Sequence, residues 1–369
     1  MKVLYIAKSY SQIGLGGTRR IKGIAEYFEN HHKCKLHFLT ENTEKNKIKN
    51  VILINTPKFL RDSNKILSSQ QTKTKSVKLL HKGWFYFFPA SLSKILFRKF
   101  DVIYATSPVF LNLIIALIYK LFHPSCFMII EYRDLYTMNP SFLRTFSLII
   151  SQKLELFILK KTNLIVTTTN GMKNKIQSFL PNLQIEVIPN YITYKDYNNP
   201  YFSLGFNKNY FHVGYIGSIN TGRDPSEILE LLDHSIQNKK IIFHFVGNST
   251  EQELIIKKKF NERSDVIFHG IVSRKESLNF MHNMDALYLI MNPDSHVSDG
   301  YGIPGKLFDY IALKNIIISK EYCIQEIEKE IKIEILQKIG SYFIFEAKET
   351  CFLENVLAQK IDKYFKDIY

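Results

Sequence analysis

A glycine-rich approach to a predicted helix is the first place in the sequence where several groups could bind one anion. Residues 299–315 read DGYGIPGKLFDYIALKN. Pro304 suits the first turn of a helix, where the backbone N–H groups of Gly305 and Lys306 can meet a phosphate. Asp309 follows one turn later, where a carboxylate can accept hydrogen bonds from ribose hydroxyls. An ordinary turn with a favourable acid near a helix start explains the same residues, and their types alone do not decide.

A second glycine-rich loop follows the first predicted strand. Gly16 and Gly17 stand just before a predicted helix, where the backbone can approach a substrate phosphate, with Arg20 nearby. The dinucleotide fingerprint GxGxxG is not met, because Arg19 stands where its last glycine belongs. A plain flexible loop explains these glycines equally well.

Charged side chains also follow two predicted buried strands. Asp134 ends the run FMIIEYRD, where it can hold a sugar hydroxyl, while Glu131 and Arg133 can pair with each other. Arg223 lies in the loop SINTGRDP, where a guanidinium can bind a diphosphate through two hydrogen bonds or pair with a neighbouring acid. In parallel α/β sheets, ligands bind at such loops, beyond the carboxyl ends of the strands.

Length and composition indicate a globular protein of two domains. The chain has 369 residues, of which 46% are hydrophobic, and four cysteines without a CxxC pair. This favours a reducing compartment and predicts neither a disulfide framework nor a zinc site. We expect no secretory signal, and the apolar run 108–122 contains Asn112 and Lys120, so we interpret it as a buried helix.

The net charge of +15 is concentrated in one segment. Residues 61–99 contain nine basic residues and one acid, and WFYFFP (84–89) lies among them. Basic and aromatic residues together suit an anionic membrane surface, single-stranded nucleic acid, or a solvated basic face over an aromatic cluster. We favour the membrane surface, and the segment's contact residues are then Lys82, Trp84, Phe85 and Phe87.

Short apolar runs alternate with helical patterns along most of the chain, which predicts parallel sheets with right-handed crossovers. The expected helices of the second half include 224–237, 250–260, 273–283 and 352–365. The fold class is therefore α/β, with two doubly wound Rossmann-like domains facing a central cleft. The expected divisions are an N-terminal domain (1–192), a linker (193–210), a C-terminal domain (211–350) and a final helix packing back on the first domain (351–369).

The order of several motifs resembles the retaining glycosyltransferases of family 4, which have the GT-B fold, and especially those of O-antigen and capsule assembly. The matching pieces are GGTRRIKGIAEYF, IIEYRDLY, NLIVTTTNGM, IEVIPN, VGYIGSI, FHFVGN, VIFHGIV and GIPGKLFDYIALKN. They occur in the family's order and cover most of residues 1–320.

The resemblance implies a nucleotide-diphosphate sugar bound mainly by the second domain and an acceptor held by the first. It implies that Asp309 binds the ribose, that Lys306 and Arg223 stabilise the diphosphate, and that Asp134 contacts acceptor or sugar. The remaining donor-binding residues would be Gly16, Gly17, Gly217, Ser218 and Gly305, and Arg20 would join the acceptor- and membrane-binding group. No metal or other cofactor is needed, and we assign no general base.

Two positions depart from the family's pattern. Tyr301 stands where the family's first acid is expected, and Ser218 follows the strand glycine where many members have a basic residue. Both changes leave the diphosphate to Arg223 and Lys306. We interpret them as subfamily variation.

The sequence therefore predicts a retaining glycosyltransferase that uses a UDP- or GDP-sugar in bacterial surface polysaccharide synthesis. Its acceptor would be a lipid-linked or growing glycan at the inner face of the cytoplasmic membrane, with no nucleic acid partner. The alternatives are a UDP-sugar 2-epimerase of the same fold and a catalytically silent subunit that binds nucleotide sugar.

Overall fold

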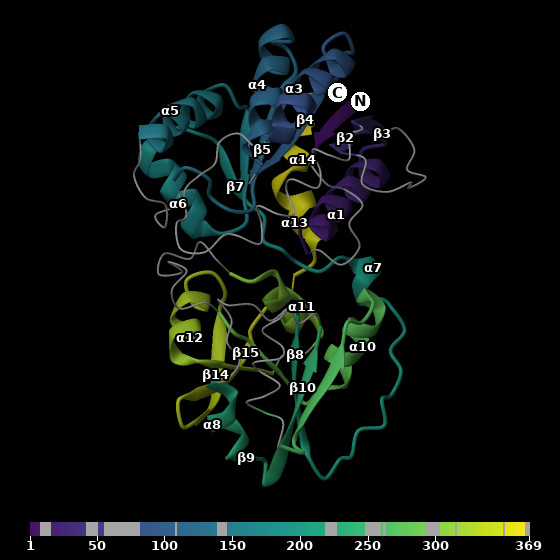
Figure 1. The fold of residues 1–369 in the computed structure, drawn as a ribbon, viewed down its shortest axis with the longest axis vertical. Helices are drawn as coiled ribbons and strands as arrows, with labels where there is room; N and C mark the ends of the chain where they lie inside the picture. Colours follow the sequence, from purple (N-terminus) through teal and green to yellow (C-terminus); the bar gives the residue numbers. More distant parts are fainter. Residues whose placement is uncertain are drawn as a thin grey trace. The chain divides into compact units, whose positions relative to one another are not determined.

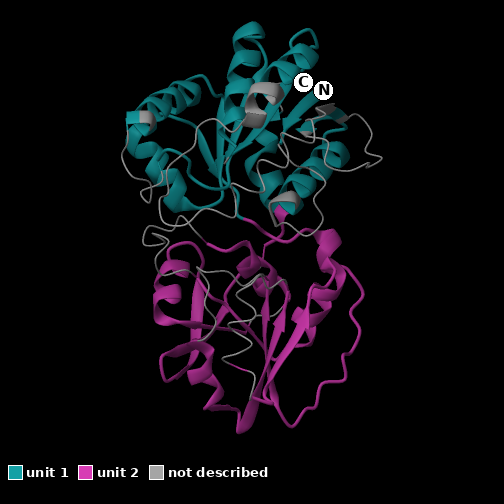
Figure 2. Cartoon of the chain, viewed as in Figure 1, with its two compact units in different colours: residues 1–189, 354–369 teal, residues 190–353 magenta. Residues whose placement is uncertain are grey.

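The computed structural model describes residues 1–7, 16–41, 51–54, 82–107, 109–138, 146–217, 227–247, 260, 263–291, 303–313, 316–349 and 351–365 (Figure 1). The chain divides into two compact units. The first contains residues 1–189 and 354–369, and the second contains residues 190–353 (Figure 2). No helix among the described residues is long and apolar enough to cross a membrane.

The first unit is built on a parallel sheet, of which seven strands are described, in the order β3-β2-β1-β4-β5-β6-β7. Most of these strands are buried along their length, which explains their near-continuous apolar sequences. The strands are β1 (Lys2–Ile6), β2 (Lys35–Glu41), β3 (Val51–Ile54), β4 (Val102–Ser107), β5 (Phe127–Tyr132), β6 (Leu164–Thr167) and β7 (Ile185–Val187).

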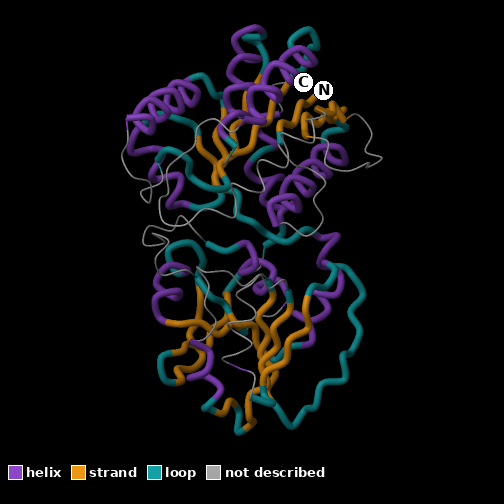
Figure 3. The backbone as a smooth tube through the Cα atoms, in the orientation of Figure 1, coloured by secondary structure: helices purple, strands orange, loops and turns teal. Residues whose placement is uncertain are grey.

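Helices connect these strands and cover both faces of the first sheet (Figure 3). Right-handed crossovers place α3 to α6 on one face and α1 on the other. The helices are α1 (Gly16–His31), α3 (Lys82–Ile95), α4 (Phe110–Phe122), α5 (Phe146–Lys160) and α6 (Asn170–Phe179). The chain's last helices, α13 (Leu353–Lys360) and α14 (Asp362–Phe365), return to this unit, where Tyr27 Oη donates to Asp362 Oδ1 at 2.7 Å.

The second unit has a mixed sheet, in the order β11-β10-β8-β12-β13-β15-β14, with β9 paired to β10. Its strands are β8 (Phe211–Ile216), β9 (Ser235–Ile236), β10 (Lys239–Val246), β11 (Val266–Gly270), β12 (Ala286–Tyr288), β13 (Ile317–Lys320), β14 (Ile333–Ile339) and β15 (Tyr342–Ala347). Its helices are α7 (Tyr194–Tyr197), α8 (Ile228–Leu232), α10 (Arg274–Asn283), α11 (Gly305–Leu313) and α12 (Glu321–Ile327).

Two parts of this unit differ from the sequence-based expectation, and a third cannot be compared. The all-parallel prediction missed the antiparallel hairpin β14–β15, which turns at Gly340 with a φ of 55°. The helix expected to reach residue 237 ends at Leu232, because β9 follows it and turns at Gln237 and Asn238, both with positive φ, into β10. The helix expected over 250–260 lies outside the described residues except for Phe260. The glycine of its two-residue turn is the sequence signal that could have revealed the β14–β15 hairpin.

Three histidines on neighbouring strands form a chain of hydrogen bonds inside the second unit. His212 Nδ1 lies 2.9 Å from His244 Nε2, and His244 Nδ1 lies 2.9 Å from His269 Nε2. At the far end, His212 Nε2 lies 2.9 Å from the carbonyl oxygen of Asn207, which can only accept. Each neutral imidazole therefore donates from Nε2. Burial, together with the neighbouring imidazoles of His269 and His212, lowers the pKa of His244 from 6.5 to about 3.

This histidine chain predicts acid sensitivity of the second unit. Because the pKa of His244 is lower in the folded state, the unfolded state takes up the proton first. The free energy of unfolding keeps the full contribution of neutral His244 above about pH 6.5. Between pH 6.5 and pH 3 it falls by up to about 1.4 kcal/mol per pH unit. Urea unfolding from pH 7 to pH 4 measures that slope. His244→Gln should flatten this pH slope, whereas His31→Gln, which changes a histidine outside the hydrogen-bonded set of three, should leave the slope unchanged. Equal slopes in the two variants would refute the role of His244.

Candidate functional site

Glycines stand at the carboxyl ends of three neighbouring strands of the second sheet. Gly217 N donates to Val246 O at 2.8 Å, and Gly247 N donates to Gly270 O at 2.8 Å. A Cβ on Gly247 would lie 2.3 Å from Gly217 O, and the φ of 146° at Gly247 also favours glycine. These glycines allow the ends of β8, β10 and β11 to pack backbone to backbone at the edge where α/β proteins bind ligands.

Lys306, the second residue of α11, brings a cation to the end of β8. Its Nζ lies 3.7 Å from the centroid of the Tyr215 ring, a cation–π contact. A Cβ added to Gly217 would lie 2.8 Å from the same Nζ. Gly217 therefore leaves the space that the ammonium group occupies, and the structure brings these two predicted residues together.

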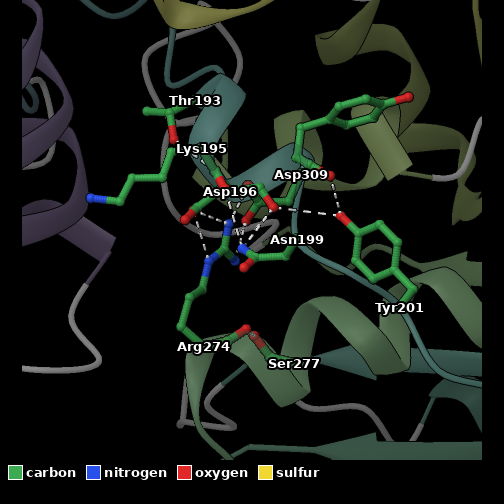
Figure 4. A network of polar contacts seen from close by, with 9 residues as sticks. Thr193, Lys195, Asp196, Asn199, Tyr201, Arg274, Ser277 and Asp309 are labelled. Carbon is green, nitrogen blue, oxygen red and sulfur yellow. Dashed lines mark hydrogen bonds and ion pairs between the residues drawn. The ribbon is translucent and has the colours of Figure 1, made fainter.

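Asp309, one turn further along α11, is almost completely buried and is held by an arginine. Only 3% of the surface of Asp309 is exposed to solvent. Arg274 Nη1 donates to Asp309 Oδ2 at 3.1 Å, and Arg274 Nη2 donates to Oδ1 at 3.0 Å. The same guanidinium donates from Nε and Nη2 to Asp196 Oδ2 at 3.1 and 2.9 Å. One arginine thus joins two carboxylates from distant parts of the second unit (Figure 4).

Helix caps place the members of this cluster. Arg274 is the first residue of α10, whose start is fixed by Ser273 and Glu276 in a reciprocal capping box. Asp196 lies in the short helix α7, where Thr193 accepts a hydrogen bond from Asp196 N at 3.2 Å. These caps fix the starts of α10 and α7, and Arg274 lies between Asp196 and Asp309.

The charges of the cluster support one another. Burial opposes the positive charge of Arg274, but the carboxylates of Asp309 and Asp196 outweigh it and raise the pKa of the guanidinium. Each oxygen of Asp309 accepts one hydrogen bond from Arg274, and the two parallel bonds fix the orientation of the carboxylate.

Several predicted donor-site residues fall outside the described part of the chain. Ser218 and Arg223 lie in the segment 218–226, and Tyr301 lies in 292–302. Gly305 begins α11, and a Cβ there would make an ordinary contact, 3.7 Å from the Cβ of Asn190. Among the described residues, Gly217, Gly305, Lys306 and Asp309 belong to one edge of the second unit.

The predicted residues of the first unit are more dispersed. Gly16 and Gly17 begin α1, and Asp134 is exposed two residues after β5. The side chains of Lys82, Trp84, Phe85 and Phe87 lie outside the described residues, although their backbone belongs to α3.

Arg20 occupies a buried position, which corrects its expected place among surface contacts. It is 4% exposed, its Nε donates to Glu131 Oε1 at 2.7 Å, and its Nη1 donates to Pro189 O at 2.8 Å. The expected pair of Glu131 with Arg133 gives way to this bond, and Arg133 Nε donates to Ser107 O at 3.1 Å. A guanidinium buried in this way cannot touch a membrane surface.

Sequence reasoning did not find Arg274, Asp196 or Tyr215. The run SRKE at 273–276 is a capping-box signal and marks the start of α10 correctly. Nothing local indicates that Arg274 pairs with an acid 35 positions away. Within the described ranges, no group of three or more histidine, cysteine, aspartate or glutamate side chains is arranged to hold a metal ion.

The arginine between the two acids should be required for stability. Arg274→Ala leaves Asp309 buried without its partner, and we expect a loss of about 2 kcal/mol in the free energy of unfolding. Urea unfolding measures this loss. Arg263→Ala is the matched control, because Arg263 pairs with the more exposed Asp233 and Asp265 and should cost under about 1 kcal/mol. Equal losses in the two variants would show that Asp309 does not depend on Arg274.

Comparison with solved structures places this architecture among known folds. No protein-family model matches the chain, and no curated protein matches its sequence significantly. Sucrose-phosphate synthase from Thermosynechococcus elongatus is similar over 100% of this chain and 90% of its own, at 12% identity and a TM-score of 0.56.

Two further solved structures have the same architecture. The apo structure of OtsA matches 87% of this chain and 84% of its own at 12% identity, with a TM-score of 0.62. A trehalose-6-phosphate synthase, studied for glycosyl transfer with retention, matches 87% of this chain and 84% of its own at 13% identity, with a TM-score of 0.56. The chain therefore has the α/β architecture of the GT-B glycosyltransferases, with two Rossmann-like domains.

Proposed function

We propose that the protein transfers a sugar from a nucleotide-diphosphate sugar and that the second unit binds this donor. The observation that carries the proposal is the pairing of two complementary groups at one end of α11. Lys306 holds a cation against Tyr215 at the end of β8, and Asp309 presents an oriented carboxylate one turn further on. A nucleoside diphosphate needs both groups, a cation for its phosphates and an acceptor for its ribose.

Lys306 is the described residue best suited to the leaving diphosphate. Negative charge develops on this group as the glycosidic bond to the sugar breaks, and a fixed ammonium group stabilises that charge. The start of α11 contributes its partial positive charge at the same end of the helix. Arg223 remains a predicted second cation for the diphosphate, and these groups would do the work that a metal ion does in other transferases.

Asp309 is the proposed ribose ligand, and Arg274 keeps its two oxygens in a fixed orientation. A carboxylate that binds both ribose hydroxyls also favours ribonucleotide donors, because a donor that lacks one hydroxyl forms one hydrogen bond fewer to it. Binding therefore selects ribonucleotide donors such as UDP- and GDP-sugars.

The finer assignment rests on the order of the sequence motifs. It comprises a retaining mechanism of family 4, a lipid-linked or growing glycan of surface polysaccharide as acceptor, and Asp134 at the acceptor or sugar. The retaining mechanism is also supported by the similar fold of the trehalose-6-phosphate synthase that was studied for glycosyl transfer with retention.

Removing the charge of Asp309 should weaken donor binding. Asp309→Asn retains the shape but loses the ionised acceptor, and we expect about tenfold weaker binding of the nucleotide sugar that most raises the melting temperature in a panel of UDP- and GDP-sugars. Calorimetric titration measures the affinity. Asp265→Asn is the control, an acid of the same unit held by Arg263 at the start of β11. Unchanged affinity in a folded Asp309→Asn protein would eliminate the ribose assignment.

Removing the cation of Lys306 should reduce turnover more than donor affinity. Lys306→Ala removes charge stabilisation that increases in the transition state, and we expect kcat to fall roughly 100-fold. Donor hydrolysis or transfer measures the rate. Lys338→Ala removes another lysine stacked on an aromatic ring, Phe343 of β15, and should leave the rate unchanged. A variant at Lys306 with normal kcat and raised KM would place the lysine in ground-state binding instead.

A further inference from the structure

Three neighbouring helices of the first unit carry large apolar side chains that face solvent. Helix α3 packs beside α4, and α4 packs beside α5 (Figure 1). Phe97, just after α3, is 94% exposed; Phe122, at the end of α4, is 68% exposed; and Phe146, at the start of α5, is 79% exposed. Single exposed apolar residues are ordinary, but this group is not single. The full set, here called the apolar face, is Phe97, Leu121, Phe122, Phe146, Ile149, Ile150 and Phe157.

Helix α5 shows that the exposure follows helical spacing. Phe146, Ile149, Ile150 and Phe157 recur at intervals of three, four or seven residues and therefore share one side of the helix. The opposite side is also apolar and buried, with Leu148, Ile158 and Leu159 among its residues. A surface helix normally turns polar residues outward. The outer side of α5 instead carries these four large apolar side chains together with the exposed Lys153 and Lys160, a mixture that suits the boundary between lipid headgroups and acyl chains.

The end of α4 contacts the segments that follow both neighbouring helices. At the end of α4, Lys120 Nζ donates to Asn163 Oδ1 at 3.1 Å, just beyond α5. On the other side of the same helix end, His123 Nε2 lies 2.8 Å from Leu96 O, next to Phe97. Leu121 and Phe122 stand between Lys120 and His123 along the chain, and Phe97 follows Leu96, so these exposed residues lie next to the bonded ones in the sequence.

The charges that surround the apolar face are nearly all positive. The exposed basic residues of these helices and their ends are Lys94, Arg98, Lys99, Lys153, Lys160 and Lys161. Among the described residues of the three helices and the loops 96–101, 121–126 and 161–163, Asp101 is the only exposed acid. Its Oδ2 already accepts from the backbone nitrogen of Lys2 at 2.6 Å. Burial lowers the pKa of His37, and the positive charges of Lys35, Arg98 and Lys2 lower it further.

We propose that the apolar face is a docking surface for an anionic lipid bilayer. Apolar side chains enter the boundary between headgroups and acyl chains, while the lysines and arginine contact the negative headgroups. A second copy of the chain is a poorer partner, because it would bring like charges together around its own apolar face. The docking surface itself does not depend on the proposed function. Its purpose does, because docking would bring the proposed enzyme to a lipid-linked acceptor.

Sedimentation of the full-length protein with liposomes tests the surface directly. We expect binding to vesicles of phosphatidylcholine with phosphatidylglycerol at low salt, much weaker binding to phosphatidylcholine alone, and loss of the difference at high salt. Donor binding is measured separately by calorimetry. Liposome binding without donor binding would overturn the proposed function alone, and donor binding without liposome binding would overturn the docking surface alone.

Variants then locate the surface. Ile149→Ser with Ile150→Ser should lower the partition coefficient at least tenfold, while Leu336→Ser, an exposed apolar residue of β14, should not. Lys153→Glu with Lys160→Glu should lower it roughly 25-fold or more at low salt, whereas Lys208→Glu with Lys240→Glu changes the net charge equally in the second unit and should have little effect.

Three results would refute the proposal. The first is equal binding to neutral and anionic vesicles. The second is equal loss in the test variants and their controls, each shown to be folded by circular dichroism. The third is a dimer in analytical ultracentrifugation that the two isoleucine substitutions dissociate, which would assign the apolar face to a second copy.

Discussion

The ion pairs of Arg274 are the constraint on which the candidate donor site depends. A carboxylate as buried as that of Asp309 remains ionised only with a partner, and the guanidinium supplies two parallel hydrogen bonds to it. The same group holds Asp196, so the starts of α10 and α7 and the first turns of α11 are fixed relative to one another. The orientation of the Asp309 carboxylate is thus set within the second unit itself, and such preorganisation would reduce the entropy lost when the proposed donor binds.

The glycines at the strand ends solve a different problem in the same place. A Cβ on Gly247 would collide with the backbone oxygen of Gly217, and a Cβ on Gly217 would collide with Lys306 Nζ. Their absence allows the ends of neighbouring strands to pack closely and lets Lys306 lie over Tyr215. A stacked ammonium group loses less conformational entropy on meeting a phosphate than one at the end of a freely moving side chain.

The sequence predicts most of this fold because alternating strands and helices leave strong local periodicities, and it places Gly217, Gly305, Lys306 and Asp309 on one unit through their loops. It does not reveal Arg274, because an ion pair between residues 35 positions apart leaves no local pattern. The same reason hides the bond between Arg20 and Glu131, which are 111 positions apart. The β14–β15 hairpin was missed because the expectation of parallel repetition overrode its short alternating strands and glycine turn.

That hairpin also determines what the second sheet can do at one of its edges. A parallel sheet that ended at β13 would leave a row of unpaired backbone groups on which another extended chain could add. The antiparallel pair covers that row and ends the sheet in β14, where a bulge between Ile335 and Gln337 and the charges of Glu334 and Lys338 interrupt regular pairing. The hairpin therefore acts as a terminus for strand addition, and it protects a chain with long apolar strands against aggregation from this edge.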